Sequence, residues 1–191
     1  MNRFWIILCI VLLPVATAAQ TKTWGPATAA KPNFDRKAKL DELFEKLSKA
    51  PNETISRIIF GDLYSAWMTA PDEEAAESMN QALRARGGFN FDKAIKILDP
   101  LIERLPNYAQ ARNERSYVYF LKNDYERSLT DCERVLEIEP RHLGCLTGMA
   151  RILIRHQKRF KAGKSVLDKA LKLNPYAYEK VLLKEIPETT L

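Results

Sequence analysis

The sequence has few of the residues on which catalytic and metal sites depend. It contains two histidines and three cysteines in 191 residues. No CxxC, HxxxH or HExxH spacing is present, so the common zinc-binding and metalloprotease patterns are excluded. His142 and Cys145 are three residues apart with no third group to orient the histidine, a poor arrangement for a thiol nucleophile. His156 falls at the other end of the same expected helix. We therefore expect no enzyme activity, no cofactor and no metal.

Glycine is scarce as well, with seven in the chain, and none forms a phosphate-binding loop. The stretch "ARGGFN" lacks the Lys-Ser/Thr ending that such a loop needs. Ala, Leu, Lys, Glu and Arg are abundant, and these residues favour helix over strand. The length suits one domain. The composition therefore predicts a single all-α domain.

The first residues have the three-part layout of a secretory signal peptide. Arg3 is followed by an apolar run over residues 4–15, and small residues close it at 16–19. The apolar run is short for a membrane span. We therefore expect residues 1–19 to be a signal peptide, with the protein exported, most simply to the periplasm. Secretion, or anchoring by an uncleaved segment, is the alternative.

Cys132 and Cys145 remain after signal removal. Two cysteines can form at most one bridge, so a disulfide-rich scaffold is excluded. An oxidising compartment would permit that bridge. Both residues fall at apolar helix positions, however, where a free cysteine packs as a small hydrophobe. The sequence leaves both possibilities open.

The clearest positive signal is a repeat of 34 and then 35 residues. Its members share a residue type at each place: aromatic at Phe91, Tyr125 and Phe160; small at Ala94, Ser128 and Gly163; proline at Pro106, Pro140 and Pro175. An upstream register, Ala82, Ser116 and Ala150, is spaced 34 and 34. The extra residue of the third copy therefore falls between Leu153 and Phe160.

Each copy has the pattern of two helices joined by a polar turn. Apolar residues recur at spacings of three and four, which predicts amphipathic helices. Proline ends the second helix because it disfavours helical backbone before it and cannot continue the hydrogen-bond ladder. Pro100 breaks this pattern, since it falls inside a second helix and predicts a kink. A two-helix unit cannot bury both faces alone, so the copies are expected to stack.

These residues resemble tetratricopeptide repeats, best over "AQARNERSYVYFLKNDYERSLTDCERVLEIEPRH" at 109–142. The whole layout is similar to small exported repeat proteins of Gram-negative bacteria. The resemblance implies an all-α, right-handed superhelical solenoid of antiparallel helix pairs with three repeats, at 75–108, 109–142 and 143–177. Arg112 stands where the family has a large aromatic, and Ser116 where it has glycine.

The flanking segments are expected to complete the solenoid. Residues 20–36, with two prolines, predict a flexible leader. Residues 37–70 show helical periodicity on both sides of Pro51 and predict a hairpin packed as an N-terminal cap, with Asn52 or Thr54 starting its second helix. Residues 178–191 predict a capping helix and tail, since the ends of a solenoid need cover.

The resemblance further implies a peptide-binding concave groove lined by the first helix of each repeat. We call the ten matching residues the groove face: Met79, Leu83, Arg86, Asn113, Tyr117, Phe120, Thr147, Arg151, Ile154 and Arg155. Tyr117 and Phe120 would be apolar anchors, and Arg151 would pair with a carboxylate. The alternative is that the apolar members only pack against their neighbours.

The charge distribution suggests a second hypothesis. The chain carries a net charge of +6, and residues 141–185 hold eleven Lys and Arg against three acidic residues. A basic end of this kind can dock on an anionic membrane surface or another polyanion. The first hypothesis is a non-enzymatic scaffold of the cell envelope that binds a protein or peptide partner. Nucleic acid is not expected as a partner, because the chain is expected to be exported.

Overall fold

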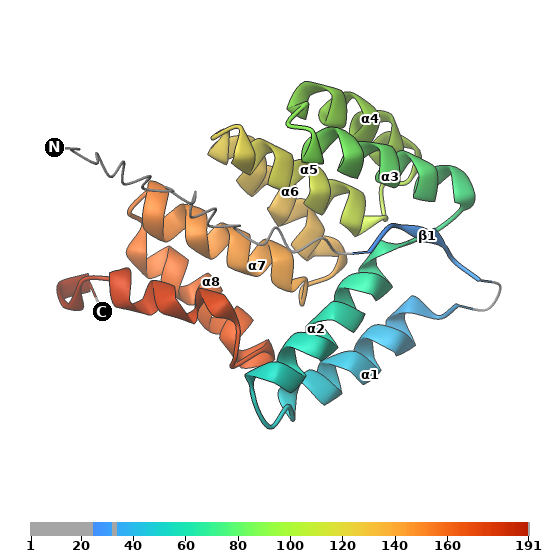
Figure 1. The fold of residues 1–191 in the computed structure, drawn as a ribbon. Helices are drawn as coiled ribbons and strands as arrows, with labels where there is room; N and C mark the ends of the chain where they lie inside the picture. Colours follow the sequence, from blue (N-terminus) through green and yellow to red (C-terminus); the bar gives the residue numbers. More distant parts are fainter. Residues whose placement is uncertain (1–24, 32–33, 191) are drawn as a thin grey trace, which may run out of the picture.

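The computed structural model describes residues 25–31 and 34–190, and most of these are helical (Figure 1). The predicted signal peptide, residues 1–19, lies outside the described residues. Three helix pairs form the repeats: α3 (Glu73–Gly87) with α4 (Phe91–Arg104), α5 (Ala109–Leu121) with α6 (Tyr125–Ile138), and α7 (Leu143–Arg151) with α8 (Phe160–Leu173). The first helices α3, α5 and α7 contact one another in order. The all-α solenoid predicted from the repeat is confirmed.

The boundaries of the second helices follow the repeated residues. Each begins at the aromatic of the turn, and each ends two residues before the proline. The residue two places before each aromatic has a positive φ: Phe89 at 58°, Asn123 at 60° and Lys158 at 55°. Left-handed backbone therefore reverses the chain at the same place in all three copies. α4 continues through Pro100.

The extra residue of the third copy changes the end of its first helix. α7 passes into a π-helical turn, η1 (Ile152–His156), in which the Gln157 amide donates to the Ile152 carbonyl at 3.0 Å. A π-helical turn holds one more residue than an α-helical turn. The insertion expected between Leu153 and Phe160 is therefore accommodated here, and the packing of α8 keeps its register.

Small residues allow the two helices of a repeat to approach closely. Ser116 of α5 faces α6, and its hydroxyl is 3.0 Å from the carbonyl oxygen of Ser128. In the third copy, a Cβ added to Gly163 would lie 2.5 Å from Cγ1 of Ile154. No other residue type fits there without a shift, because real Cβ contacts are essentially never that short.

The N-terminal hairpin consists of α1 (Arg36–Ser48) and α2 (Glu53–Met68). The Asn52 side chain caps α2 by accepting the Ile55 amide at 3.0 Å. Leu43, Leu47 and Leu63 are buried between the two helices or against the repeats. A hairpin was expected here, and it is present.

Its position differs from the expected end cap, because the hairpin lies across the repeats (Figure 1). Tyr64 donates to Glu114 of α5 at 3.3 Å, and Trp67 stacks on His142 at the start of α7, with 4.3 Å between ring centroids. Ser56 donates to Asn174 after α8 at 2.8 Å. The physical reason is that Leu143, Leu146 and Ala170 expose an apolar surface that the hairpin covers.

The described part of the predicted leader is not free. β1 (Thr28–Ala29) pairs in parallel with β2 (Thr69–Ala70), the short strand between α2 and α3. Ala27 is buried, and its backbone exchanges two hydrogen bonds with the Asn80 side chain at 2.8 and 3.0 Å. The prediction of a flexible leader is therefore wrong for this stretch, since its backbone groups are satisfied by β2 and α3.

The C-terminal segment covers the third repeat as expected, but as a 3-10 helix, η2 (Tyr178–Glu185). Leu182 and Ile186 are buried in one cluster with Ala150, Ile154 and Leu167. A short 3-10 helix, η3 (Glu188–Thr190), follows. The apolar end of the solenoid is thus closed by this segment.

Candidate functional site

The groove face comes from the first helices of the repeats, and the structure divides its members into buried and exposed ones. Met79 on α3 and Ile154 on η1 are fully buried. Met79 packs with Ala27 and Met68, and Ile154 packs with Leu182. For these two residues the packing alternative holds, because the chain's own N-terminal and C-terminal segments cover them. Leu83 stays half-buried beside the first of these clusters.

The third repeat contributes two arginines that the C-terminal segment neutralises. Arg151 pairs with Glu179 at 2.6 Å, and Arg155 pairs with Glu185 at 2.5 Å. The second pair is more exposed, and the Arg155 guanidinium lowers the pKa of the Glu185 carboxyl. Thr147 donates its hydroxyl to the Leu143 carbonyl at 2.9 Å. These groove positions therefore have internal partners.

The second repeat carries the exposed centre of the groove face. Tyr117 and Phe120 lie one turn apart on α5 with ring centroids 6.2 Å apart and planes tilted by 10°. The guanidinium carbon of Arg86 is 5.0 Å from the Tyr117 ring centroid, and that of Arg151 is 6.0 Å from the Phe120 centroid. We call Arg86, Tyr117, Phe120 and Arg151 the aromatic ladder. Tyr117 is 43% exposed, so the ladder is open to solvent at its middle.

A buried polar network anchors one end of the ladder. Arg86 pairs at 2.8 Å with Glu114, which is only 3% exposed. Gln110 and Tyr64 donate to the other carboxylate oxygen at 3.0 and 3.3 Å. Burial raises the pKa of the Glu114 carboxyl, while Arg86 acts in the opposite direction. A carboxylate buried with three partners fixes the position of Arg86.

The network continues to the two residues that first suggested a nucleophile. His142 caps α7, with Nδ1 accepting the Cys145 amide at 3.3 Å and Nε2 donating to Gln110 at 3.1 Å. Burial lowers the pKa of His142 to about 3. The Cys145 thiol donates instead to Asn113 at 3.3 Å, and burial raises the pKa of that thiol. A protonated thiol and a histidine engaged elsewhere do not form a nucleophile pair.

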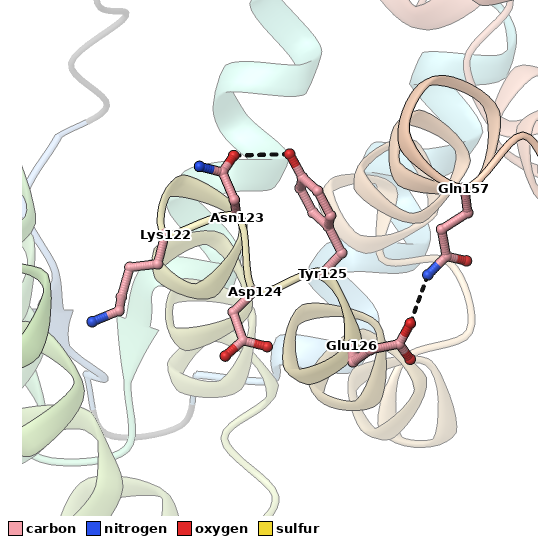
Figure 2. Close-up of a pocket in the computed structure, with 6 residues that line it drawn as sticks. All are labelled: Lys122, Asn123, Asp124, Tyr125, Glu126 and Gln157. Carbon is pink, nitrogen blue, oxygen red and sulfur yellow. Dashed lines mark hydrogen bonds between the residues drawn. The ribbon is translucent and has the colours of Figure 1, made fainter.

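A shallow pocket lies at the turn between α5 and α6, next to the far end of the ladder (Figure 2). It is lined by Lys122, Asn123, Asp124, Tyr125, Glu126 and Gln157. Tyr125 donates to Asn123 at 2.8 Å, and Gln157 donates to Glu126 at 2.9 Å. The Tyr125 ring also stacks on His156 at 4.2 Å, and His156 contacts Phe120 edge-on. The Tyr125–Asn123 bond thus holds the turn between α5 and α6, and the Gln157–Glu126 bond joins α6 to the third repeat.

No cluster of metal-ligating residues occurs within residues 25–31 and 34–190. The same part of the chain contains no helix long and apolar enough to cross a membrane. Among the members of the groove face, the aromatic ladder contains the most solvent-exposed ring, that of Tyr117.

The sequence did not indicate the polar network beneath the ladder. Glu114 lies four residues after Gln110, so the helical period places these two side chains close together. Its burial depends on Tyr64 and Arg86, which come from two other helices. The pattern of a single sequence does not show which residues of different helices come into contact.

Comparison with known proteins agrees with the repeat pattern. The tetratricopeptide repeat family model matches residues 109–142, which is the second helix pair. A TPR repeat-containing protein of Rhizobium etli is 32% identical, over an alignment that covers 76% of each chain. On the repeated residues, the helix pairs and this likeness, the chain belongs to the tetratricopeptide repeat family.

Proposed function

We propose that this protein is a non-enzymatic scaffold of the cell envelope that binds a protein partner through the aromatic ladder. Tetratricopeptide repeats are generally protein-interaction modules without catalytic activity. The observation that carries the proposal is the exposed Tyr117 ring stacked beside the half-buried Phe120 ring, between two arginines. Flat aromatic rings and Arg are the side chains most enriched at binding hot spots.

The ladder is suited to an extended peptide. Arg86 and Arg151 are each held by one carboxylate, Glu114 and Glu179, so both guanidinium groups are ordered before a partner arrives. Ordered side chains lose less conformational entropy on binding. Tyr117 offers an apolar face of its ring together with a hydroxyl group, which can form a hydrogen bond with the partner's backbone.

The envelope assignment is supported by the sequence of residues 1–19 alone, which has the composition of an export signal. Export would place the ladder in a compartment where nucleic acid is absent. The partner is accordingly expected to be another envelope protein.

A second candidate function is docking of the basic end on an anionic membrane surface. Exposed cations cluster on and before α8: Lys158, Arg159, Lys161, Lys169 and Lys172. Attraction of exposed charges is screened by salt, with a Debye length of about 3 Å at 1 M. Binding through these residues should therefore vanish at high salt, whereas binding through the ladder should persist.

The test is a crosslinking pull-down from envelope extract with the mature chain and two ladder variants, Tyr117→Ala and Arg151→Glu. Matched controls remove a tyrosine and reverse an arginine elsewhere: Tyr178→Ala, where the tyrosine is 79% exposed, and Arg134→Glu on α6. All variants are first shown to have the helical content of the parent.

A partner captured by the parent and by both controls, and lost with both ladder variants, supports the proposal. Equal capture by all five proteins at high salt would contradict it. Capture that disappears in high salt, and is weakened by reversing Lys169 and Lys172, would favour the basic end instead.

A further inference from the structure

Two thiols lie together beneath the groove face, at the junction between the second and third repeats. Cys132 of α6 and Cys145 of α7 belong to one buried cluster, and both are free cysteines. The Cys132 sulfur is 3.0 Å from the Ser116 hydroxyl, and the Cys145 sulfur is 3.3 Å from the Asn113 side-chain oxygen. Ser116 and Asn113 are one turn apart on the same face of α5. Both sulfurs are therefore held against one turn of that helix.

The two sulfurs lie in the same part of the core. Asn113 and Ser116, which they contact, are three residues apart on α5, a spacing at which Cβ atoms are about 5–6 Å apart. α6 and α7 pack on one another, and both cysteines belong to one buried cluster. A disulfide needs two cysteines held close together in this way.

We propose that Cys132 and Cys145 can form a disulfide that joins the second repeat to the third. This bond would also change the hydrogen bonding beneath the groove face, at Asn113. Both S–H bonds break and one S–S bond forms. The two electrons pass to the disulfide of an oxidant, such as glutathione disulfide or a protein of the thiol–disulfide exchange class, which leaves as two thiols with the two protons. The reaction proceeds through a mixed disulfide.

The structure restricts when the bond forms. Both thiols are buried, and burial raises the pKa of the Cys145 thiol, which is a poor nucleophile while it is protonated. Oxidation therefore occurs during folding or in a locally opened state, and the packed, reduced protein reacts slowly. A bond closed before α7 docks would remain protected by the same burial.

Oxidation removes a hydrogen-bond donor from a groove position. In the reduced protein, the Cys145 thiol donates to Asn113, a member of the groove face. A disulfide has no S–H, so the Asn113 oxygen becomes free to accept a hydrogen bond from elsewhere. The consequence for partner binding rests on the proposed function, whereas the disulfide itself does not.

The experiment refolds the full mature chain in a mixture of reduced and oxidised glutathione. Intact mass measured without reductant should show the loss of two hydrogens, and the unfolded product should contain no titratable thiol. Cys132→Ala and Cys145→Ala serve as matched controls that keep one thiol each. Two free thiols, mixed disulfides with glutathione or linked dimers as the main product would overturn the proposal.

Two further measurements compare the oxidised protein with the reduced protein. The midpoint of thermal unfolding should be higher for the oxidised than for the reduced protein, and dithiothreitol should abolish the difference. The side-chain amide resonance of Asn113, assigned with an Asn113→Ala variant, should shift on oxidation. A disulfide that leaves this resonance unchanged would refute the link to the groove, and this result is independent of whether any partner binds.

Discussion

Replacing Trp67 with alanine should remove a large part of the stability of this protein. The indole is 3% exposed and lies between the hairpin and the repeats. Its ring centroid is 6.1 Å from that of Phe44, 6.5 Å from that of Phe60 and 4.3 Å from that of His142. Truncating a buried Phe or Trp to Ala costs about 3–5 kcal/mol. Because folded domains are stable by only about 5–15 kcal/mol, the effect should be severe.

The measurement is urea unfolding followed by circular dichroism. The midpoint should fall by roughly 1–5 M, since the slope for small domains is about 1–3 kcal/mol per M. Ile58→Ala on the same helix is the control, because Ile58 is 58% exposed and its truncation should change stability little. A loss below about 1 kcal/mol for Trp67→Ala would refute the packing of the hairpin across the repeats.

Trp67→Phe sharpens the same test. Among the described residues, the Trp67 indole nitrogen is buried and has no hydrogen-bond partner. Leaving such a group unpaired costs about 1–3 kcal/mol. Phenylalanine removes that donor but keeps most of the ring contacts, so its cost should be far smaller than that of alanine. Equal losses for both variants would contradict this account of the site.

Three further predictions concern single positions. The His142 pKa falls from 6.5 when unfolded to about 3 when folded, so the unfolded chain binds more protons between these values. The free energy of unfolding, measured by urea unfolding, should therefore decrease as the pH falls through that window. It should decrease less for His142→Asn, which keeps a capping acceptor but has no group that titrates there. Gly163→Ala should destabilise the protein by about 1–3 kcal/mol, because the added Cβ would meet Ile154. Gly148→Ala should stabilise it by about 0.4–1 kcal/mol, because a Cβ there has open space. Equal melting temperatures for the two variants would contradict this prediction. Phe89→Gly should stabilise by about 1 kcal/mol, since it relieves left-handed backbone at an exposed side chain, and a lower melting temperature would oppose it.

The periodic parts of the fold were predictable from the sequence. The aromatics and prolines of the repeat mark the ends of α4, α6 and α8, because turn and helix-stop chemistry is local. The extra residue near Leu153 was also visible as a change of spacing. Its form, a π-helical turn, depends on tertiary packing that keeps α8 in place.

The placement of the flanking segments was not predictable, for a physical reason. An amphipathic hairpin has an apolar face, but the pattern does not say which surface it will cover. Trp67 therefore gave no sign that it would stack on His142, which is distant in the sequence. Met79 and Arg151 lie on the first helices of their repeats, as the repeat pattern predicted. Their cover by Ala27 and Glu179 comes from segments whose docking the sequence leaves open.

The measurement that tests the central claim most directly is site-specific photocrosslinking in the native host. A photoreactive phenylalanine analogue replaces Tyr117 in the aromatic ladder or, as a control, Tyr178, which is more exposed and lies outside it. The proposed function predicts one defined protein adduct from position 117, and none from position 178. An adduct formed only from position 178, or no adduct from position 117 while the protein remains folded, would contradict the assignment of the ladder as the binding site.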